Sequence, residues 1–182
     1  MRIITGQYKG RHFEIPRSFK ARPTTDFAKE NIFNVLGGYI DFEGAQALDL
    51  FSGTGSISFE LLSRGCSEVY SVEMDRDHHR FITECLKKLG TDRCTPLRGD
   101  VFRFIKSCRM RFDFVFADPP YALKELPTLP DLILNKPLLK PEGILVFEHG
   151  KTNDFSKHPL FVEHRSYGSV NFSIFKGAPS PQ

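Results

Sequence analysis

Residues 47–62, ALDLFSGTGSISFELL, decide the fold of this chain, because they combine a strand, a glycine-rich turn and the start of a helix. The apolar run ends near Asp49, and the helical segment begins at about residue 56. Gly53 and Gly55 let the backbone approach a ligand closely, and the helix N-terminus after them offers unpaired N–H groups. The stretch therefore predicts a ligand site where a strand passes into a helix.

Strand-like and helical runs alternate on both sides of this stretch. Such alternation predicts βαβ units and a parallel sheet. Proline-rich residues 122–137 are a poorer helix, and residues 161–177 indicate two closing strands around Tyr167–Gly168. We predict a doubly wound α/β domain with a mostly parallel seven-stranded sheet and an antiparallel end. The other strands are expected at 46–50, 68–73, 94–99, 112–117 and 143–148, and the helices at about 56–63, 76–89 and 101–107.

The N-terminal part extends this domain. Residues 2–15 resemble a β-hairpin, and residues 22–38 a helix that Pro23 opens and Gly37–Gly38 ends. Thr24 or Thr25 can cap the helix, and its apolar face is expected to contain Phe27, Ile32, Phe33 and Leu36. We divide the chain into an N-terminal basic hairpin and helix, the main domain and a short tail, at residues 1–40, 41–178 and 179–182.

Composition is that of a globular protein of one domain: 182 residues, 40% hydrophobic and 26% charged. No apolar run approaches the ~20 residues of a membrane helix, and no signal peptide is recognisable, so we expect a cytoplasmic protein without membrane contact. The four cysteines are scattered and the six histidines lack ligand spacing. We therefore expect reduced thiols and no metal.

Positive charge gathers at the N-terminus. Residues 1–36 contain seven Lys or Arg and three Asp or Glu, whereas the rest of the chain contains eighteen and nineteen. A polyanionic partner at that end is one explanation and a solvated terminus is the other. A second basic cluster, at residues 103–111, is interpreted as a solvated helix face.

Acidic residues stand at three successive strand ends, where open parallel sheets bind ligands. Asp49 would repel a pyrophosphate but suits a ligand with a cationic centre and an ammonium group. Glu73 can accept both hydroxyls of a ribose, and Asp100 can meet an adenine edge. An adenosine with a cationic amino-acid tail is S-adenosylmethionine, which we predict as the cofactor. A dinucleotide site is disfavoured by Asp49 and by Ser58, which stands where its third glycine belongs.

The apolar run of residues 112–117 delivers an acid, two prolines and an aromatic residue into a rigid turn, DPPY at 118–121. An exocyclic amine of a purine is a poor nucleophile, because its lone pair is delocalised into the ring. The Asp118 carboxylate and the Pro119 carbonyl can accept hydrogen bonds from such an amine and free that lone pair. Tyr121 offers a ring on which a flipped base can stack.

These motifs resemble those of class I S-adenosylmethionine-dependent methyltransferases, and more closely the bacterial 16S rRNA guanine-N2 methyltransferases. RIITGQYKGR, RPTTDFAKENIFN and RSYGSVNFSIF at the two ends narrow the resemblance to this family. It implies methyl transfer to guanine N2 in 16S rRNA of the small ribosomal subunit, by an enzyme expected to be a monomer. It implies catalytic residues Asp118, Pro119, Pro120 and Tyr121. It implies cofactor contacts from Asp49, Phe51, Gly53, Gly55, Ser56, Glu73, Met74, Asp100 and Val101, and RNA contacts from Arg2, Lys9, Arg11, Arg22 and Thr24.

Two other functions stay open at the level of sequence. A DNA adenine-N6 methyltransferase also uses a DPPY turn, although this chain has little spare length for a target-recognition region. A non-catalytic RNA-binding assembly factor could keep the same fold, although the intact turns at 53–55 and 118–121 argue against it.

Overall fold

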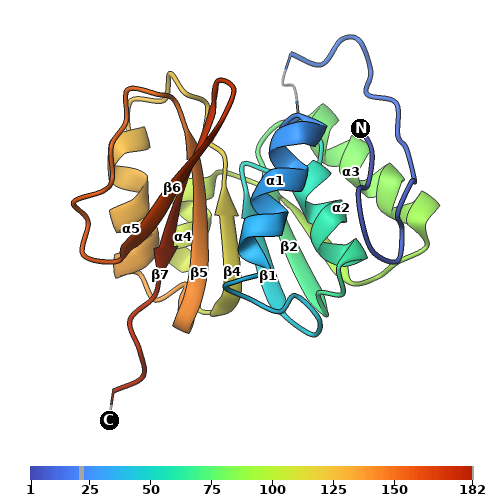
Figure 1. Ribbon diagram of the computed structural model, residues 1–182. Coiled ribbons are helices and arrows are strands. Elements are labelled where there is room, and N and C mark those ends of the chain that lie inside the picture. The colour runs from blue at the N-terminus through green and yellow to red at the C-terminus, as the bar shows by residue number, and fades with distance from the viewer. Residues whose placement is uncertain (21–22, 182) are drawn as a thin grey trace.

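The computed structural model describes residues 1–20 and 23–181 and contains one seven-stranded sheet with helices on both faces (Figure 1). The strand order is β3-β2-β1-β4-β5-β7-β6. The first five strands pair in parallel, and β7 is antiparallel to both β5 and β6. The strands are β1 (Gln46–Leu50), β2 (Glu68–Glu73), β3 (Cys94–Arg98), β4 (Phe112–Ala117), β5 (Leu139–His149), β6 (Phe161–Tyr167) and β7 (Val170–Lys176). The predicted α/β class and mostly parallel sheet are confirmed.

Helices α1, α2 and α3 cover one face of the sheet, and α4 and α5 cover the other (Figure 1). Along β4 the side chains alternate between these two cores: Phe114 and Phe116 pack toward α1–α3, and Val115 and Ala117 toward α4 and α5. The helices are α1 (Asp26–Leu36), α2 (Ser56–Ser63), α3 (Arg76–Leu89), α4 (Val101–Ser107) and α5 (Leu129–Asn135), with a short 3₁₀ turn at Leu126–Thr128. The prolines of 122–137 explain why α5 is short.

The predicted N-terminal hairpin is present in a minimal form. An antiparallel bridge joins Arg2 to His12, backbone hydrogen bonds join Ile3 to Arg11 and Phe13 to Met1, and residues 5–10 form the turn, but no regular strand develops. The segment is also held to α2: the carboxylate of Glu60 accepts hydrogen bonds from the backbone N–H groups of Ile4 and Thr5, at 2.8 and 3.1 Å. Its shape therefore depends on packing against the main domain, which strand propensity does not encode.

Helix α1 buries three of the four residues predicted for its apolar face, Ile32, Phe33 and Leu36, but not Phe27. Thr25 caps it through a hydrogen bond from the Ala28 N–H, but Phe27 is 64% exposed, with only the edge of Tyr167 near its ring. Lys29 is buried instead. Its Nζ donates to the Arg2 carbonyl at 2.7 Å and to Ser56 Oγ at 2.9 Å, and lies 3.8 Å from the Glu60 carboxylate. Burial lowers the pKa of Lys29, and the charge of Glu60 opposes that shift.

No helix in the described part of the chain is long and apolar enough to span a membrane. All four cysteines are buried free thiols. Burial raises the pKa of Cys66 to about 12 and that of Cys85 to about 11, so neither is a nucleophile at neutral pH.

Candidate active site

A cleft of about 630 Å³ opens at the carboxyl ends of β1, β2 and β4, a volume typical of small-molecule sites. It contains every predicted catalytic residue and eight of the nine predicted cofactor residues. Those lining it are Asp49, Phe51, Gly53, Ser56, Glu73, Met74, Asp100, Val101, Asp118, Pro119, Pro120 and Tyr121. The topology thus brings together residues that the sequence separates widely.

The remaining predicted residues lie elsewhere. Gly55 does not line the cleft: it caps α2 with φ +83°, and a Cβ there would lie 2.8 Å from the ring of Phe59. Close helix packing, rather than ligand approach, therefore requires this glycine. Thr24, expected to contact RNA, lines the cleft instead. Arg22 lies outside the described residues.

Asp49 sits at the bottom of the cleft and is only 1% exposed. The hydroxyl of Ser58 donates to its Oδ2 at 2.6 Å. Burial raises the pKa of Asp49 to about 7, and the charge of Glu73 adds to the shift, although the bonds from Ser58 oppose it. Ser58, which sequence analysis noted only because it replaces the third glycine of a dinucleotide motif, therefore holds the buried carboxyl group of Asp49.

Two further acids at strand ends have partners of their own. The side chain of Asp100 accepts a hydrogen bond from the Arg103 N–H at 3.0 Å and so caps α4. Glu73 lies 3.7 Å from Nδ1 of His78. Burial raises the pKa of Glu73, and His78 opposes that shift. Both acids line the cleft while they keep these partners.

Asp118 follows β4 directly, and a bond of 3.3 Å from its N–H to the Leu50 carbonyl ties it to the end of β1. Because Ala117 pairs with Phe147 of β5, the next residue of β5, Glu148, comes to lie beside Asp118. Burial, and then the charge and hydrogen bond of Glu148, raise the pKa of Asp118 well above its ordinary value. The two side chains form a carboxyl pair.

Sequence reasoning missed Glu148. It is 5% exposed and lines the cleft. Its Oε1 accepts a hydrogen bond from the Thr24 hydroxyl at 2.8 Å, and its Oε2 accepts one from the Tyr121 hydroxyl at 3.1 Å. The signal was available, because Glu148 is a fifth acid at the carboxyl end of a predicted strand, after Asp49, Glu73, Asp100 and Asp118.

The cleft is strongly acidic. Six carboxyl side chains line it, and no Lys or Arg does so among the described residues. They are Asp49, Glu73, Asp75, Asp100, Asp118 and Glu148. Such a lining favours a cationic ligand and repels phosphate groups.

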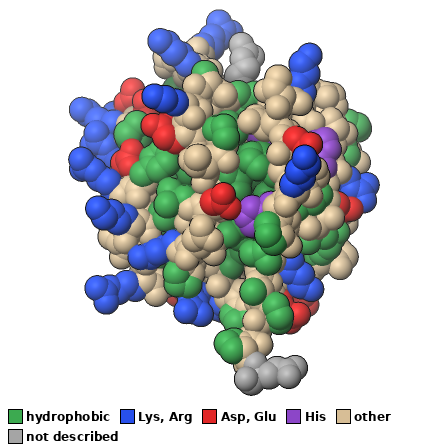
Figure 2. Space-filling model, turned by 90° about the vertical axis from the view of Figure 1, so that its left-hand side faces the viewer, with side chains coloured by type: hydrophobic (Ala, Val, Ile, Leu, Met, Phe, Trp, Pro, Cys, Tyr) green, Lys and Arg blue, Asp and Glu red, His purple; other side chains and the backbone are tan. Residues whose placement is uncertain are grey.

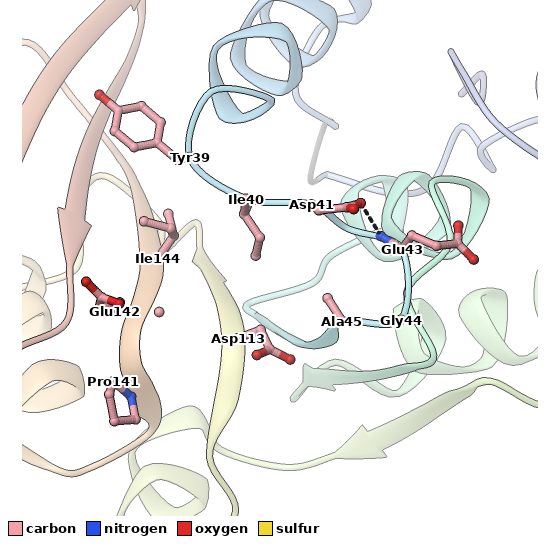
Figure 3. Close-up of a pocket in the computed structure, with 11 residues that line it drawn as sticks. Tyr39, Ile40, Asp41, Glu43, Gly44, Ala45, Asp113, Pro141, Glu142 and Ile144 are labelled. Carbon is pink, nitrogen blue, oxygen red and sulfur yellow. Dashed lines mark hydrogen bonds between the residues drawn. The ribbon is translucent and has the colours of Figure 1, made fainter. Parts of the chain in front are cut away.

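A second hollow, of about 250 Å³, lies at the opposite end of the strands, between residues 39–45 and 141–144 (Figure 3). Its polar lining is also acidic, with Asp113 and Glu142 among the side chains, and none of the predicted site residues reaches it. Within the described residues, no group of three His, Cys, Asp or Glu side chains could hold a metal ion.

Two groups of basic residues outside the cleft bear on a polyanionic partner. Arg2, Lys9 and Arg11 are exposed on the N-terminal segment, where Arg2 lies 3.4 Å from Asp26 and Arg11 donates to the Lys88 carbonyl. The second group surrounds a hollow near the end of α4 and consists of Lys106, Arg109, Arg111 and Lys136. Figure 2 shows how Lys and Arg side chains gather along one border of the face on the α5 and β6 side.

The sheet order, the antiparallel end and the glycine-rich turn define a methyltransferase of the Rossmann-like fold. The chain belongs to the conserved hypothetical protein 95 family, whose model matches residues 1–176. The resemblance noted from the motifs is thereby confirmed.

Its relatives carry methyltransferase names. The chain is 33% identical to the "Putative rRNA methyltransferase YlbH" of Bacillus subtilis, over 97% of this chain and 98% of that protein. It is 31% identical to the ribosomal RNA small subunit methyltransferase D of Escherichia coli K12, over 97% and 89%. A solved structure described as "Putative methyltransferase yhhF from Escherichia coli" superposes with a TM-score of 0.86 at 26% identity, covering 99% of both chains.

Proposed function

We propose that this protein transfers a methyl group from S-adenosylmethionine to the exocyclic N2 amine of a guanine in 16S rRNA of the small ribosomal subunit. One observation carries the proposal: a rigid DPPY turn presents Asp118 in an acidic cleft at the carboxyl ends of the strands. Relatives named for methylation of small-subunit rRNA support the class of substrate.

The donor set of the cleft fits S-adenosylmethionine. The buried carboxyl group of Asp49 accepts a hydrogen bond from the Ser58 hydroxyl, no Lys or Arg lines the cleft beside it in the described residues, and burial raises its pKa. Asp49 would face the ammonium-bearing tail, Glu73 the ribose and Asp100 the adenine. The lining around them contains Phe51, Gly53, Ser56, Met74 and Val101. When bound, the cofactor supplies an electrophilic methyl group on a sulfonium.

The chain itself supplies position and hydrogen bonds. The Asp118 carboxylate and the Pro119 carbonyl accept the two N–H groups of the target amine and turn its lone pair out of the purine plane. Pro119 and Pro120 hold these acceptors in place, because their rings fix the backbone. Holding reactants in such an arrangement contributes ~7–11 kcal/mol in favourable cases. The carboxyl group of Asp118 also accepts the proton that the methylated amine loses.

The RNA backbone must stay outside this acidic cleft, so a single base has to be flipped into it. The ring of Tyr121 is 48% exposed at the mouth and can stack on that base. Arg2, Lys9 and Arg11 are exposed on the N-terminal segment and are the proposed phosphate contacts. We propose residues 1–40 as the RNA-binding extension and residues 41–178 as the methyltransferase domain.

The test is a labelled-methyl assay on small subunits from a strain that lacks this protein, followed by nucleoside identification. N2-methylguanosine is the expected product. N6-methyladenosine would instead establish an adenine methyltransferase. No transfer to subunits, assembly intermediates or naked 16S rRNA by a correctly folded protein would favour a non-catalytic assembly factor.

A further inference from the structure

Glu148 is a buried carboxyl group that the chemistry proposed above does not use. It is 5% exposed, lines the cleft and shares a hydrogen bond with Asp118. Donors from two other parts of the chain, Thr24 and Tyr121, hold it in one orientation. A carboxylate has about four lone-pair positions, so each oxygen can accept one more donor.

This arrangement is costly for the free protein. Two adjacent carboxyl groups disfavour ionisation of each other, and no Lys or Arg lines the cleft within the described residues to offset their charge. An apolar residue at 148 would avoid that cost and still fill the end of β5. The pair is therefore better explained by a ligand that brings donors to both carboxyl groups.

A guanine has such donors side by side. Its Watson–Crick edge presents the N1–H group next to the N2 amine, so two neighbouring acceptors match it. Adenine differs at this point, because its N1 is a lone pair that would face a carboxylate directly. A flipped base is commonly read along this edge.

We propose that Glu148 is the residue that selects guanine: it accepts the N1–H of the flipped base while Asp118 accepts the adjacent N2–H. This inference rests on the proposed function, since it names the contact that directs the same site to guanine. Thr24 and Tyr121 are positioning residues for Glu148. The DPPY turn alone serves any exocyclic amine, and the carboxyl group beside it supplies the choice of base.

The test replaces the target guanosine, once the labelled-methyl assay has mapped it, by 2,6-diaminopurine riboside in reconstituted small subunits. This analogue keeps the N2 amine but carries a lone pair at N1. We expect the unaltered protein to methylate it at least ~10²-fold more slowly than guanosine, because sites built around a hydrogen bond discriminate strongly against analogues that lack it. Equal rates would overturn the proposal without any variant.

Glu148→Gln sharpens the test, because its amide can donate to the N1 lone pair of the analogue. The preference for guanosine should fall by about 10-fold or more. Glu73→Gln is the matched control: it makes the same change in the same cleft and should slow both substrates without altering their ratio. Thermal unfolding of both variants verifies that they fold.

The outcomes separate this inference from the proposed function. If the unaltered protein forms N2-methylguanosine but Glu148→Gln keeps the full preference for guanosine, Glu148 does not select the base and the proposed function stands. If the unaltered protein modifies no guanine, both fail together.

Discussion

Asp118 and Glu148 share one wall of the cleft, and each changes the behaviour of the other. Burial, and then the charge of Glu148, raise the pKa of Asp118. Without a ligand, the Asp118 carboxyl group is therefore harder to ionise than an isolated one. A cationic ligand in the cleft favours the ionised form, which is the form that accepts a hydrogen bond from an amine.

Replacing Asp118 should affect the chemical step. Asp118→Ala removes the acceptor and should lower the single-turnover rate by about 10²-fold or more. Asp118→Asn keeps one acceptor oxygen and should be milder. Both should still bind cofactor and small subunits, as measured by calorimetry and filter binding. A near-normal rate for Asp118→Ala would reduce the DPPY turn to a structural role.

Tyr121 offers both a ring and a hydroxyl group. The sequence alone predicts that Tyr121→Phe is nearly silent if the ring only stacks. The hydroxyl of Tyr121 donates a hydrogen bond to Glu148, so we instead expect Tyr121→Phe to lower the single-turnover rate by about 2–10-fold, the usual effect of losing one donor. Tyr121→Ala should lose more, since the ring is removed as well. Equal single-turnover rates for Tyr121→Phe and Tyr121→Ala would exclude stacking of the Tyr121 ring on the base.

At the scale of residues, sequence reasoning identified the motifs but not their partners. Asp49 and Asp118 stand beside strongly patterned strands, so their place at the sheet edge follows from the pattern. Glu148, Thr24 and Ser58 act through side-chain contacts between distant segments. Such contacts depend on which strands pair, which no local pattern specifies.

At the scale of elements, α1 shows the limit of periodicity. Ile32, Phe33 and Leu36 are buried as predicted, but the first turn departs from the pattern: Lys29 enters the core and Phe27 does not. Hydrophobicity alone cannot predict this, because the buried ammonium group is held by Glu60 of α2 and the Arg2 carbonyl. The burial of this first turn is set by the polar partners of one side chain.

The N-terminal segment touches α2 so closely that one glycine cannot be replaced. Gly6 has φ +94°, and a Cβ on it would lie only 1.8 Å from the Ser63 carbonyl oxygen. Gly6→Ala should detach the segment and speed amide exchange of Ile4 and Thr5. Gly10→Ala is the matched control: φ there is also positive, at +84°, but nothing lies within 4 Å. Equal exchange in both variants would show that backbone strain alone is responsible.

The same segment should govern the salt dependence of RNA binding. Replacing Lys9 and Arg11 together by Ala should flatten the plot of log affinity against log salt by roughly one to two units, through lost phosphate contacts. Cofactor affinity should not change. The matched pair Lys106 and Arg109, in the second basic group, should leave the slope unaltered. A change in slope for that pair alone would move the RNA path to the α4 side.

At the scale of the whole molecule, alternating strands and helices predicted the sheet well, and all seven strands lie close to their predicted positions. The strand order was not predictable. β7 lies between β5 and β6, and its partners are chosen by the apolar side chains it buries, such as Phe172 and Ile174. Local sequence marks a strand, whereas its neighbours are fixed by the complete core.

The acidic cleft should make stability depend on pH. The pKa of Asp49 is about 7 in the folded chain and near 4 when unfolded, so the folded state binds the proton more tightly. As the pH rises from about 4 to 7, Asp49 lowers the free energy of unfolding by an amount on the order of 4 kcal/mol. Asp49→Asn should therefore gain stability relative to the unaltered protein across this range and no further above it.

Urea unfolding without ligand at a series of pH values measures this difference. Asp92→Asn removes a charge from an exposed position and is the control. A difference between Asp49→Asn and the unaltered protein that does not vary with pH would mean that Asp49 is not protonated on folding.

The bond between Thr24 and Glu148 joins residues 124 positions apart. During synthesis, the amino-terminal portion leaves the ribosome first. The hydrogen bond of Thr24 therefore cannot form until nearly the whole polypeptide has emerged. Strand β7 must emerge later still before β5 is paired on both sides. A nascent chain consequently lacks a complete catalytic centre. A protein proposed to modify ribosomal particles thus gains that ability only when translation of its own message is almost finished.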